Sequence, residues 1–383
     1  MTVCLLAVSN DPTIAMPPDT IAGDTHQRQL RYASILKAYH LITQAPRGRN
    51  TAPLQWTDNF RVYPCGQPVS AVRMGWKIVR ENEVDVVSTQ DPFITGLVGY
   101  LIARRFRLPL SLQFAADMVD NPFWLYEKPA NLLLNHLAHL LIRRADSFRV
   151  VSLSERDKLM RLGIPLERIW NLGWLTDFAR FLNAEGDKVR AFYLERGYHR
   201  LVLFAGRLMP QKDLPTLLRA VPLVLADHPR TLFLIAGDGP LERALRDQVK
   251  RAGLSDSVNF VGVVPYKEIP DYFAACDAFV LPSIYEGNAR VLAEAAAAAR
   301  PAVSTDVSGA RDTIVDGETG FIVRVRDHEA LAGRLSALLS DPELATRMGQ
   351  KARQHILRLY DPERLLDGFR QLWETTARMK GWR

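Results

Sequence analysis

Residues 285–301 read YEGNARVLAEAAAAARP and are the most informative segment of this 383-residue chain. Within it, Glu286 and Glu294 stand eight residues apart. Ala, Leu and Glu dominate the second half, which predicts a helix that begins just after the Gly287-Asn288 turn. A carboxylate accepts hydrogen bonds from neighbouring sugar hydroxyls. The segment therefore predicts a loop-to-helix junction that carries two carboxylates for binding a sugar.

A second segment, FAGRLMPQKDLPTLL at 204–218, places two cations directly after a predicted buried strand. Arg207 offers a planar fork of donors, and Lys212 offers a compact ammonium group. Both can stabilise the charge that develops on a diphosphate leaving group. Each segment alone could be an ordinary strand–helix unit with solvated charges. The two together, in this order, favour a site for a nucleoside-diphosphate sugar.

Backbone groups complete the predicted donor site. Gly206 precedes the first cation and allows close approach of a ligand to the backbone. The amides near the start of the predicted helix would point at the diphosphate, because a helix N-terminus favours an anion. These amides belong to Asn288, Ala289, Arg290 and Val291.

At these residues the chain resembles the retaining glycosyltransferases of family four. The matching segments are GRLMPQKD (206–213), IAGDGPLERAL (235–245), VNFVGVV (258–264), CDAFVLPSIYEGNARVLAEA (276–295) and ARPAVSTDVSGARDTIVDGETGFIV (299–323). The family's Glu-x7-Glu pattern falls on Glu286 and Glu294, and its Arg/Lys pair on Arg207 and Lys212. The resemblance implies that Glu286 contacts the transferred sugar and Glu294 the nucleotide ribose. Two departures are Asp213 after the lysine and Ala299 near the end of the helix, where relatives usually have Gly.

The resemblance implies a GT-B fold, an α/β architecture of two facing Rossmann-like, doubly wound domains with a cleft between them. The sequence agrees, because short apolar strands alternate with helical segments along two series. We expect an acceptor-binding domain over 1–178, a nucleotide-sugar-binding domain over 198–360, and a helix over 361–383 that crosses back to the first domain. The first series is expected to contain a strand over 2–9 and a helix over 26–40. Further strands are predicted at 84–90, 109–114, 147–152, 201–206, 232–237, 258–262, 278–283 and 301–306.

The acceptor side is less clearly marked. In the family, a glycine in the loop after the first strand lets the backbone approach the donor phosphates, and Gly23 lies in that place, although it could be an ordinary turn glycine. Relatives often carry His-x-Asp after the strand that matches 109–114. Here the aspartate is Asp117, but Ala115 stands at the histidine position. His26, at the start of a predicted helix, is the substitute that we consider. Ala115 is compatible with transfer, since the leaving phosphate oxygen can accept the acceptor proton.

The net charge of +7 lies mostly in residues 1–180, which hold 21 Lys and Arg against 16 Asp and Glu. Six arginines are singled out there: Arg104, Arg105, Arg107, Arg143, Arg144 and Arg149. They adjoin two apolar helical segments, 93–107 and 130–145. Two interpretations stay open. The helices could lie on an anionic bilayer surface, or they could pack on the sheet with solvated arginines at their C-terminal ends. No nucleic-acid-binding motif is found, so a nucleic acid partner is not expected.

Other classes of site find no support. There is no Asp-x-Asp, zinc-ligand spacing or phosphate-binding glycine loop, so we expect no cofactor and no requirement for a divalent metal. The three cysteines are few and far apart, which is typical of a reducing compartment. The first residues lack a basic leader, and no segment approaches eighteen apolar residues. These features predict a cytoplasmic chain, in peripheral contact with the inner face of a membrane at most.

The sequence thus predicts a retaining, metal-independent hexosyltransferase. Its donor would be a nucleoside-diphosphate sugar, with UDP favoured and GDP second by family frequency. Its acceptor would be a lipid-linked or growing cell-surface glycan, as in cell-envelope polysaccharide biosynthesis. Two alternatives remain. A catalytically silent nucleotide-sugar-binding subunit of a partner enzyme is favoured by Ala115, and a nucleotide-sugar epimerase is disfavoured by the Glu-x7-Glu segment.

Overall fold

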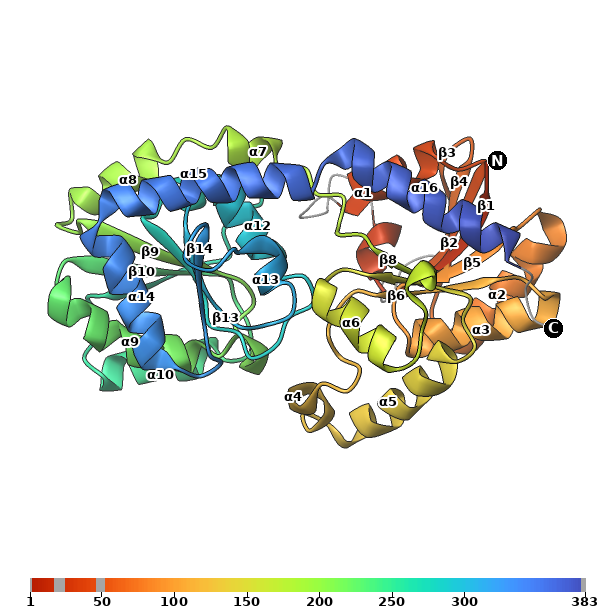
Figure 1. The fold of residues 1–383 in the computed structure, drawn as a ribbon, viewed down its shortest axis with the longest axis horizontal. Coiled ribbons are helices and arrows are strands. Elements are labelled where there is room, and N and C mark those ends of the chain that lie inside the picture. The colour runs from red at the N-terminus through yellow and green to blue at the C-terminus, as the bar shows by residue number, and fades with distance from the viewer. Residues whose placement is uncertain (1, 17–24, 46–51, 380–383) are drawn as a thin grey trace. The chain divides into compact units, whose positions relative to one another are not determined.

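The computed structural model describes residues 2–16, 25–45 and 52–379. The chain divides into two compact units: the first comprises residues 1–176 and 360–383, and the second comprises residues 177–359. Each unit is built on its own sheet, in which helices connect parallel strands (Figure 1). The predicted α/β class, with two strand series, is confirmed.

The first unit contains an eight-stranded sheet in the order β3-β4-β2-β1-β5-β6-β7-β8. Its pairs are parallel except for β3, which runs antiparallel to β4 at the edge. The strands are β1 Cys4–Val8, β2 Ala38–Gln44, β3 Leu54–Thr57, β4 Phe60–Cys65, β5 Val86–Thr89, β6 Leu110–Phe114, β7 Ser147–Val150 and β8 Ile169–Asn171. The α-helices are α1 Thr25–Ser34, α2 Pro68–Glu81, α3 Ile94–Phe106, α4 Pro122–Leu125, α5 Pro129–Ile142, α6 Leu153–Arg161 and α16 Pro362–Arg378, with 3-10 turns η1 Pro12–Ala15 and η3 Leu166–Arg168.

The predicted helix over 26–40 is wrong in its second half. Helix α1 ends at Ser34, and β2 begins at Ala38. The register pairs Tyr39 with Leu5 of β1 on one side and with Phe60 of β4 on the other. Strand β2 is thus flanked on both sides, and this tertiary pairing overrides the helical periodicity that continues through the segment.

The last helix belongs to the first unit, although it ends the chain. In Figure 1, the blue α16 accompanies the red and orange N-terminal elements. It packs on α1 and on β5, β6 and β7. Its buried residues are spaced as one helical face: Leu365, Phe369, Leu372, Trp373 and Thr376. The hydroxyl groups of Thr376 and Ser147 hydrogen-bond at 2.7 Å in the core.

The second unit contains a six-stranded parallel sheet in the order β11-β10-β9-β12-β13-β14. Its strands are β9 Arg200–Ala205, β10 Thr231–Ala236, β11 Val258–Gly262, β12 Ala278–Leu281, β13 Ala302–Thr305 and β14 Gly320–Val323. The helices are α7 Ala179–Leu182, α8 Asp187–Leu194, α9 Leu214–Asp227, α10 Glu242–Arg251, α11 Ile269–Ala275, α12 Arg290–Ala297, α13 Ala310–Thr313, α14 His328–Ser340 and α15 Pro342–Leu359, with the 3-10 turn η4 Pro210–Lys212. Strand β9 lies near the middle of the sheet beside β12, so the loops that follow them meet at one edge.

Among the described residues, no helix is both long enough and apolar enough to cross a bilayer. The cysteines Cys4, Cys65 and Cys276 are buried free thiols. Burial raises the pKa of the Cys276 thiol to about 12, so it is protonated and serves as a packing residue.

Candidate functional site

Arg207 lies in the loop that follows β9. The backbone of this loop packs closely on two glycines, Gly237 and Gly239. A Cβ at Gly237 would lie 2.1 Å from the carbonyl oxygen of Gly206, and one at Gly239 would lie 2.5 Å from that of Leu208. The Leu208 amide donates to the Asp238 carbonyl at 2.6 Å. The Arg207 backbone is therefore fixed between two such contacts. Its guanidinium is solvent-exposed and makes no hydrogen bond or ion pair within the described part of the chain.

Lys212 and Glu286 form the centre of the site. The ammonium of Lys212, at the end of η4, lies 2.5 Å from Oε1 of Glu286, in the loop between β12 and α12. Ser283 donates to the same carboxylate oxygen at 2.6 Å. The two charged side chains are only 15% and 10% exposed, so the pair is poorly screened by solvent.

Backbone contacts hold the two loops together next to this pair. The Ile284 amide donates to the Gln211 carbonyl at 2.9 Å, and the Gln211 side chain donates to the Tyr285 carbonyl at 2.9 Å. Hydrogen bonds thus join the two loops that carry the sequence motifs, although these are about seventy residues apart. The two loops are held together at one edge of the sheet, which suits catalysis by positioning.

The segment before α12 is buried and closely packed. Asn288 and Ala289 are nearly inaccessible, and Ala289 adopts the left-handed conformation at φ 47°. A Cβ at Gly309 would lie 2.8 to 2.9 Å from backbone atoms of Asn288. The amides of Ala289 and Val291 make no hydrogen bond among the described residues. They remain as donors at the start of the helix, where an anion is favoured.

Glu294 lies on the first turns of α12 and forms an ion pair with Arg290. The Arg290 Nε to Glu294 Oε1 distance is 3.2 Å, and the glutamate side chain is 16% exposed. The backbone of Arg290 therefore lies at the start of the helix beside the site, while its side chain holds the Glu294 carboxylate in place.

The two departures from glycine both fall on left-handed backbone. Asp213 has φ 43° and Ala299 has φ 55°, a region that glycine enters without strain. The Asp213 carboxylate accepts a hydrogen bond from the Thr216 hydroxyl at 2.7 Å, which supports the strained turn locally. The chain thus keeps the usual conformations of these turns with residues that tolerate them less well.

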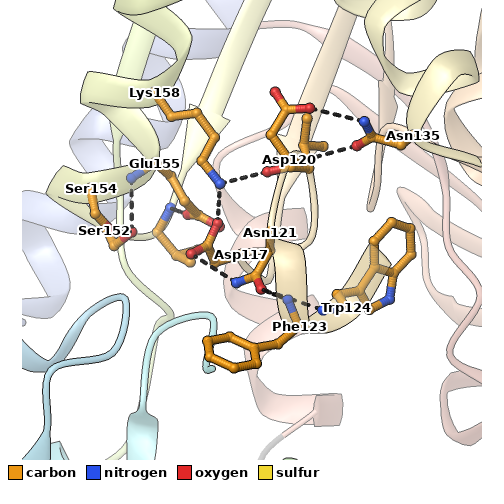
Figure 2. Close-up of polar contacts among 12 residues, drawn as sticks. Asp117, Asp120, Asn121, Phe123, Trp124, Asn135, Ser152, Ser154, Glu155 and Lys158 are labelled. Carbon is orange, nitrogen blue, oxygen red and sulfur yellow. Dashed lines mark hydrogen bonds and ion pairs between the residues drawn. The ribbon is translucent and has the colours of Figure 1, made fainter. Parts of the chain in front are cut away.

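In the first unit, Asp117 follows β6 and is held in place by charge (Figure 2). Lys158 of α6 forms an ion pair with Asp117 and also donates to the Val119 carbonyl at 2.5 Å. The Asn121 amide lies 3.4 Å from the other carboxylate oxygen. Ala115 lies two residues earlier, half-buried. The loop that carries both residues is therefore tied to α6.

The same loop is tied to α5 on its other side. Asp120 has φ 55°, and its amide donates to the Asn135 side chain at 2.9 Å. Asn135 in turn donates to the Asp120 carboxylate at 2.9 Å, and His139 Nε2 lies 2.8 Å from the same oxygen. Figure 2 shows the Asn135 contacts on the side opposite to Lys158. His139 thus helps to fix this loop.

Glu155 is drawn beside Asp117 in Figure 2 and is 2% exposed. The Val151 amide donates to its Oε2 at 3.1 Å, whereas Oε1 has no partner among the described residues. Burial raises the pKa of this carboxyl to about 8, so it is mostly protonated at neutral pH. Sequence analysis missed Glu155 and Lys158. The spacing Ser152-x-x-Glu155, a helix-capping signature, could have identified the glutamate.

His26 is the second residue of α1 and is buried. Its ring stacks on Trp56 of β3 with a centroid distance of 4.0 Å. Burial lowers the pKa of His26, which favours the neutral imidazole. No contact joins it to the Asp117 loop within the described residues. Gly23 lies outside the described residues, and the same residues contain no cluster of three or more His, Cys, Asp or Glu side chains that could hold a metal.

Two family models match the chain. Residues 187–355 match the model described as Glycosyl transferases group 1, and residues 37–172 match that of the Glycosyl transferase 4-like domain. The chain belongs to the glycosyl transferases group 1 family.

Individual relatives agree. Alpha-D-kanosaminyltransferase of Streptomyces kanamyceticus is 29% identical over 66% of this chain and 67% of the relative. Glycogen synthase of Mycobacterium tuberculosis is 30% identical over 62% of this chain and 53% of the relative. D-inositol 3-phosphate glycosyltransferase of Streptomyces avermitilis is 30% identical over 74% of this chain and 64% of the relative. The chain thus spans about half to two thirds of the length of these relatives.

Solved structures show the fold. Sucrose-phosphate synthase from Thermosynechococcus elongatus has a TM-score of 0.79 at 20% identity, over 97% of this chain and 98% of that one. HepE of Anabaena, solved in complex with UDP, has a TM-score of 0.74 at 17% identity, over 98% and 100%. The chain therefore has the GT-B fold that the sequence predicted.

Proposed function

We propose that this glycosyltransferase moves a hexose from a nucleoside-diphosphate sugar to a glycan acceptor with retention of configuration and without a metal. The observation that carries the proposal is the Lys212–Glu286 ion pair, 2.5 Å long and nearly buried, at the edge of the second sheet. In an empty site, each group neutralises the other. When a donor binds, Lys212 can turn to the diphosphate, and Glu286 can accept sugar hydroxyls.

The remaining donor-site residues take the roles that the motifs suggest. Arg207 is exposed at the end of β9 and can form a bidentate contact with the diphosphate. The free amides of Ala289 and Val291 can bind the same group. Glu294, fixed by Arg290, is assigned to the ribose. Because the leaving oxygen accepts the acceptor proton, stabilising its charge is the main contribution of these residues.

The second unit is assigned to the donor, and the first unit, with Asp117, to the acceptor. UDP is favoured as the nucleotide because HepE was solved with UDP and with UDP-glucose. GDP is second, since a mannosyltransferase among the relatives is described as GDP-mannose-dependent.

Calorimetric titration with UDP-, GDP-, ADP- and dTDP-sugars tests this proposal. We expect one nucleotide class to bind, and a ligand at about 100 times its dissociation constant to stabilise the fold by about 2.7 kcal/mol. Arg207→Ala should weaken that binding, whereas Arg251→Ala, at the exposed end of α10, should not. If no nucleotide sugar bound to the folded protein, the donor site would be refuted. If one bound without any transfer or hydrolysis, the silent-subunit alternative would replace the enzyme.

We further propose that the acceptor is lipid-linked, for cell-envelope polysaccharide synthesis at the cytoplasmic face of a membrane. Support comes from the surface of α4 and α5, where Tyr126, Leu133 and Leu140 are 83%, 76% and 62% exposed. Exposed basic residues lie at both ends of α5: Lys128, Arg143 and Arg144. An apolar face with a basic margin suits an anionic bilayer surface. The opposite face of α5 packs on α3, so only the exposed face of this helix is assigned to the bilayer.

Co-sedimentation with phosphatidylglycerol-containing vesicles measures this contact. We expect the protein to bind them, and the Leu133→Asp/Leu140→Asp variant to bind at least about tenfold more weakly, because it loses two exposed apolar side chains that would enter the bilayer. Leu223→Asp alters a half-exposed leucine of α9 and serves as the control. Equal binding of all three proteins, or no binding by the wild type, would contradict the proposal.

A further inference from the structure

Arg149 is a buried cation that the donor site does not use. It lies on β7 and is 0% exposed, although the sequence placed it among the surface arginines. Its guanidinium donates at 2.9 Å to three neutral acceptors, which are the carbonyls of Leu172 and Gly173 and the side-chain oxygen of Gln113. No carboxylate within the described part of the chain forms an ion pair with it. A buried charge that lacks a counter-charge is costly to fold.

A second cation lies close to it. The guanidinium of Arg28, on α1, lies 4.9 Å from the ring centroid of Trp174, and that of Arg149 lies 4.4 Å from the same centroid. Burial lowers the pKa of Arg149, and the charge of Arg28 acts in the same direction. Glu155 is an acid whose field reaches Arg149, but its raised pKa leaves it mostly neutral at pH 7. The two arginines therefore create positive potential that Glu155 does not offset.

This potential lies beside a polar cavity at the carboxyl ends of β1, β5 and β6. Among the residues that line it are Ser9, Arg28, Ser88, Gln113, Trp174 and Trp373. The indole nitrogen of Trp373 is buried and makes no hydrogen bond among the described residues, so a donor is left without an acceptor. Gln113 contacts Arg149 with its oxygen, and its nitrogen donates to Ser88 at 3.0 Å. The cavity wall thus includes an indole donor without an acceptor among the described residues, as well as the Arg28 cation.

Asp11 is the one acid among the described residues that line the cavity. Its Oδ1 already accepts hydrogen bonds from the amide and hydroxyl of Thr13, which cap η1. Its single negative charge is outnumbered by Arg28 and Arg149. A cavity with this balance of charge in a low-dielectric wall attracts an anion.

We propose that this cavity binds an anionic group of the acceptor, either a phosphate ester or a carboxylate. Arg28 is the direct ligand. Arg149 is a positioning residue: it contacts Trp174, adds positive charge near the cavity, and orients Gln113 through a hydrogen bond. The assignment of the ligand as an acceptor rests on the function proposed above. The site itself depends only on the first unit.

The test is a titration in an Arg207→Ala/Lys212→Met/Glu286→Gln background, which removes phosphate binding at the donor site without leaving Glu286 as an unpaired buried charge. The probes are glucose 1-phosphate, glucuronate and uncharged glucose. We expect at least one of the charged sugars to bind at least about tenfold more tightly than glucose. Arg28→Met should abolish that difference, Arg28→Lys should retain part of it, and Arg31→Met, one turn further along α1, should retain all of it. The preferred probe distinguishes a phosphate from a carboxylate.

Nuclear magnetic resonance of the indole N–H groups locates the ligand. We expect the preferred probe to shift the Trp174 or Trp373 resonance, each assigned with its Trp→Phe variant. Equal affinity for charged and uncharged sugars, or equal affinity of the Arg28→Met variant, would overturn the proposal. Arg149→Met is a supplementary variant, because its buried site could fail to fold, and the Arg28 series decides without it. Loss of nucleotide-sugar binding in the wild type would instead overturn the donor site and leave this result standing.

Discussion

Lys212→Met is expected to lower kcat/KM for sugar transfer by about 10²- to 10³-fold, since it removes a preorganised charge from the departing diphosphate. The lysine lies at the end of η4, and hydrogen bonds of the Gln211 carbonyl and side chain hold that turn against the β12 loop. The backbone that carries the ammonium is thus in place before the substrate arrives. Initial rates of transfer or of donor hydrolysis measure the effect. Lys250→Met, on the exposed side of α10, provides the matched control.

The same substitution is expected to destabilise the second unit. The Glu286 side chain is 10% exposed, and without Lys212 it keeps only the Ser283 hydroxyl as a side-chain donor among the described residues. Removing one partner of a nearly buried ion pair typically costs about 3 to 5 kcal/mol. A loss of activity could therefore reflect a loss of folded protein, and the prediction needs a variant that separates the two.

The Lys212→Met/Glu286→Gln double variant separates them. Glutamine is neutral and can still accept from Ser283, so we expect thermal stability to recover most of the loss. Activity should not recover, because the variant has neither the cation nor the carboxylate. A double variant that regained activity together with stability would show that the pair is structural. A Lys212→Met enzyme with unchanged kcat/KM would contradict the role of the lysine directly.

The sequence was sufficient for the strands of the second unit. Strands β9, β10 and β12 are continuous apolar runs, since parallel strands between helices are buried on both faces. It was insufficient for β2, where residues 26–40 carry a helical pattern but the last part pairs with β1 and β4. That pairing depends on segments distant in the chain, which no local pattern encodes.

For the candidate site, too, the sequence predicted some features and not others. Residue types and spacing predicted Arg207, Lys212, Glu286 and Glu294 as site residues, but they could not predict the ion pairs that Lys212 forms with Glu286 and Arg290 forms with Glu294. The burial of Arg149 was also beyond the sequence, because its neighbours Gln113 and Leu172 are distant along the chain. A cation counted from composition looks like surface charge, and only the fold shows whether it is covered.

The sequence also did not reveal which glycines are needed for close backbone packing. Gly237 stands in AGDGP, which the sequence offered only as part of a segment that resembles the family. Its φ of 123° is a conformation that side chains rarely adopt, and its amide donates to the Gly262 carbonyl at 2.7 Å. The backbone of Gly206, directly before Arg207, packs against Gly237.

Gly237→Ala is therefore expected to destabilise the second unit by more than about 3 kcal/mol, a magnitude reserved for strain and steric overlap in the core. The added Cβ would lie 2.1 Å from the Gly206 oxygen, and the neighbouring backbone is not a flexible group that can move aside. Gly253→Ala is the matched control. It has φ 68°, but open space surrounds its Cβ position, so left-handed strain alone should cost about 1 to 2 kcal/mol.

Chemical denaturation of both variants measures the difference. If Gly237→Ala cost no more than Gly253→Ala, the steric argument would fail and only backbone strain would remain. Any Gly237→Ala protein that folds must do so by displacing the Gly206–Arg207 backbone. Its affinity for the donor should then fall even in the folded fraction, whereas Gly253→Ala should bind normally. Because this loss occurs without any change to a charged residue, it would show that the second unit holds Arg207 in position through the packing of its backbone.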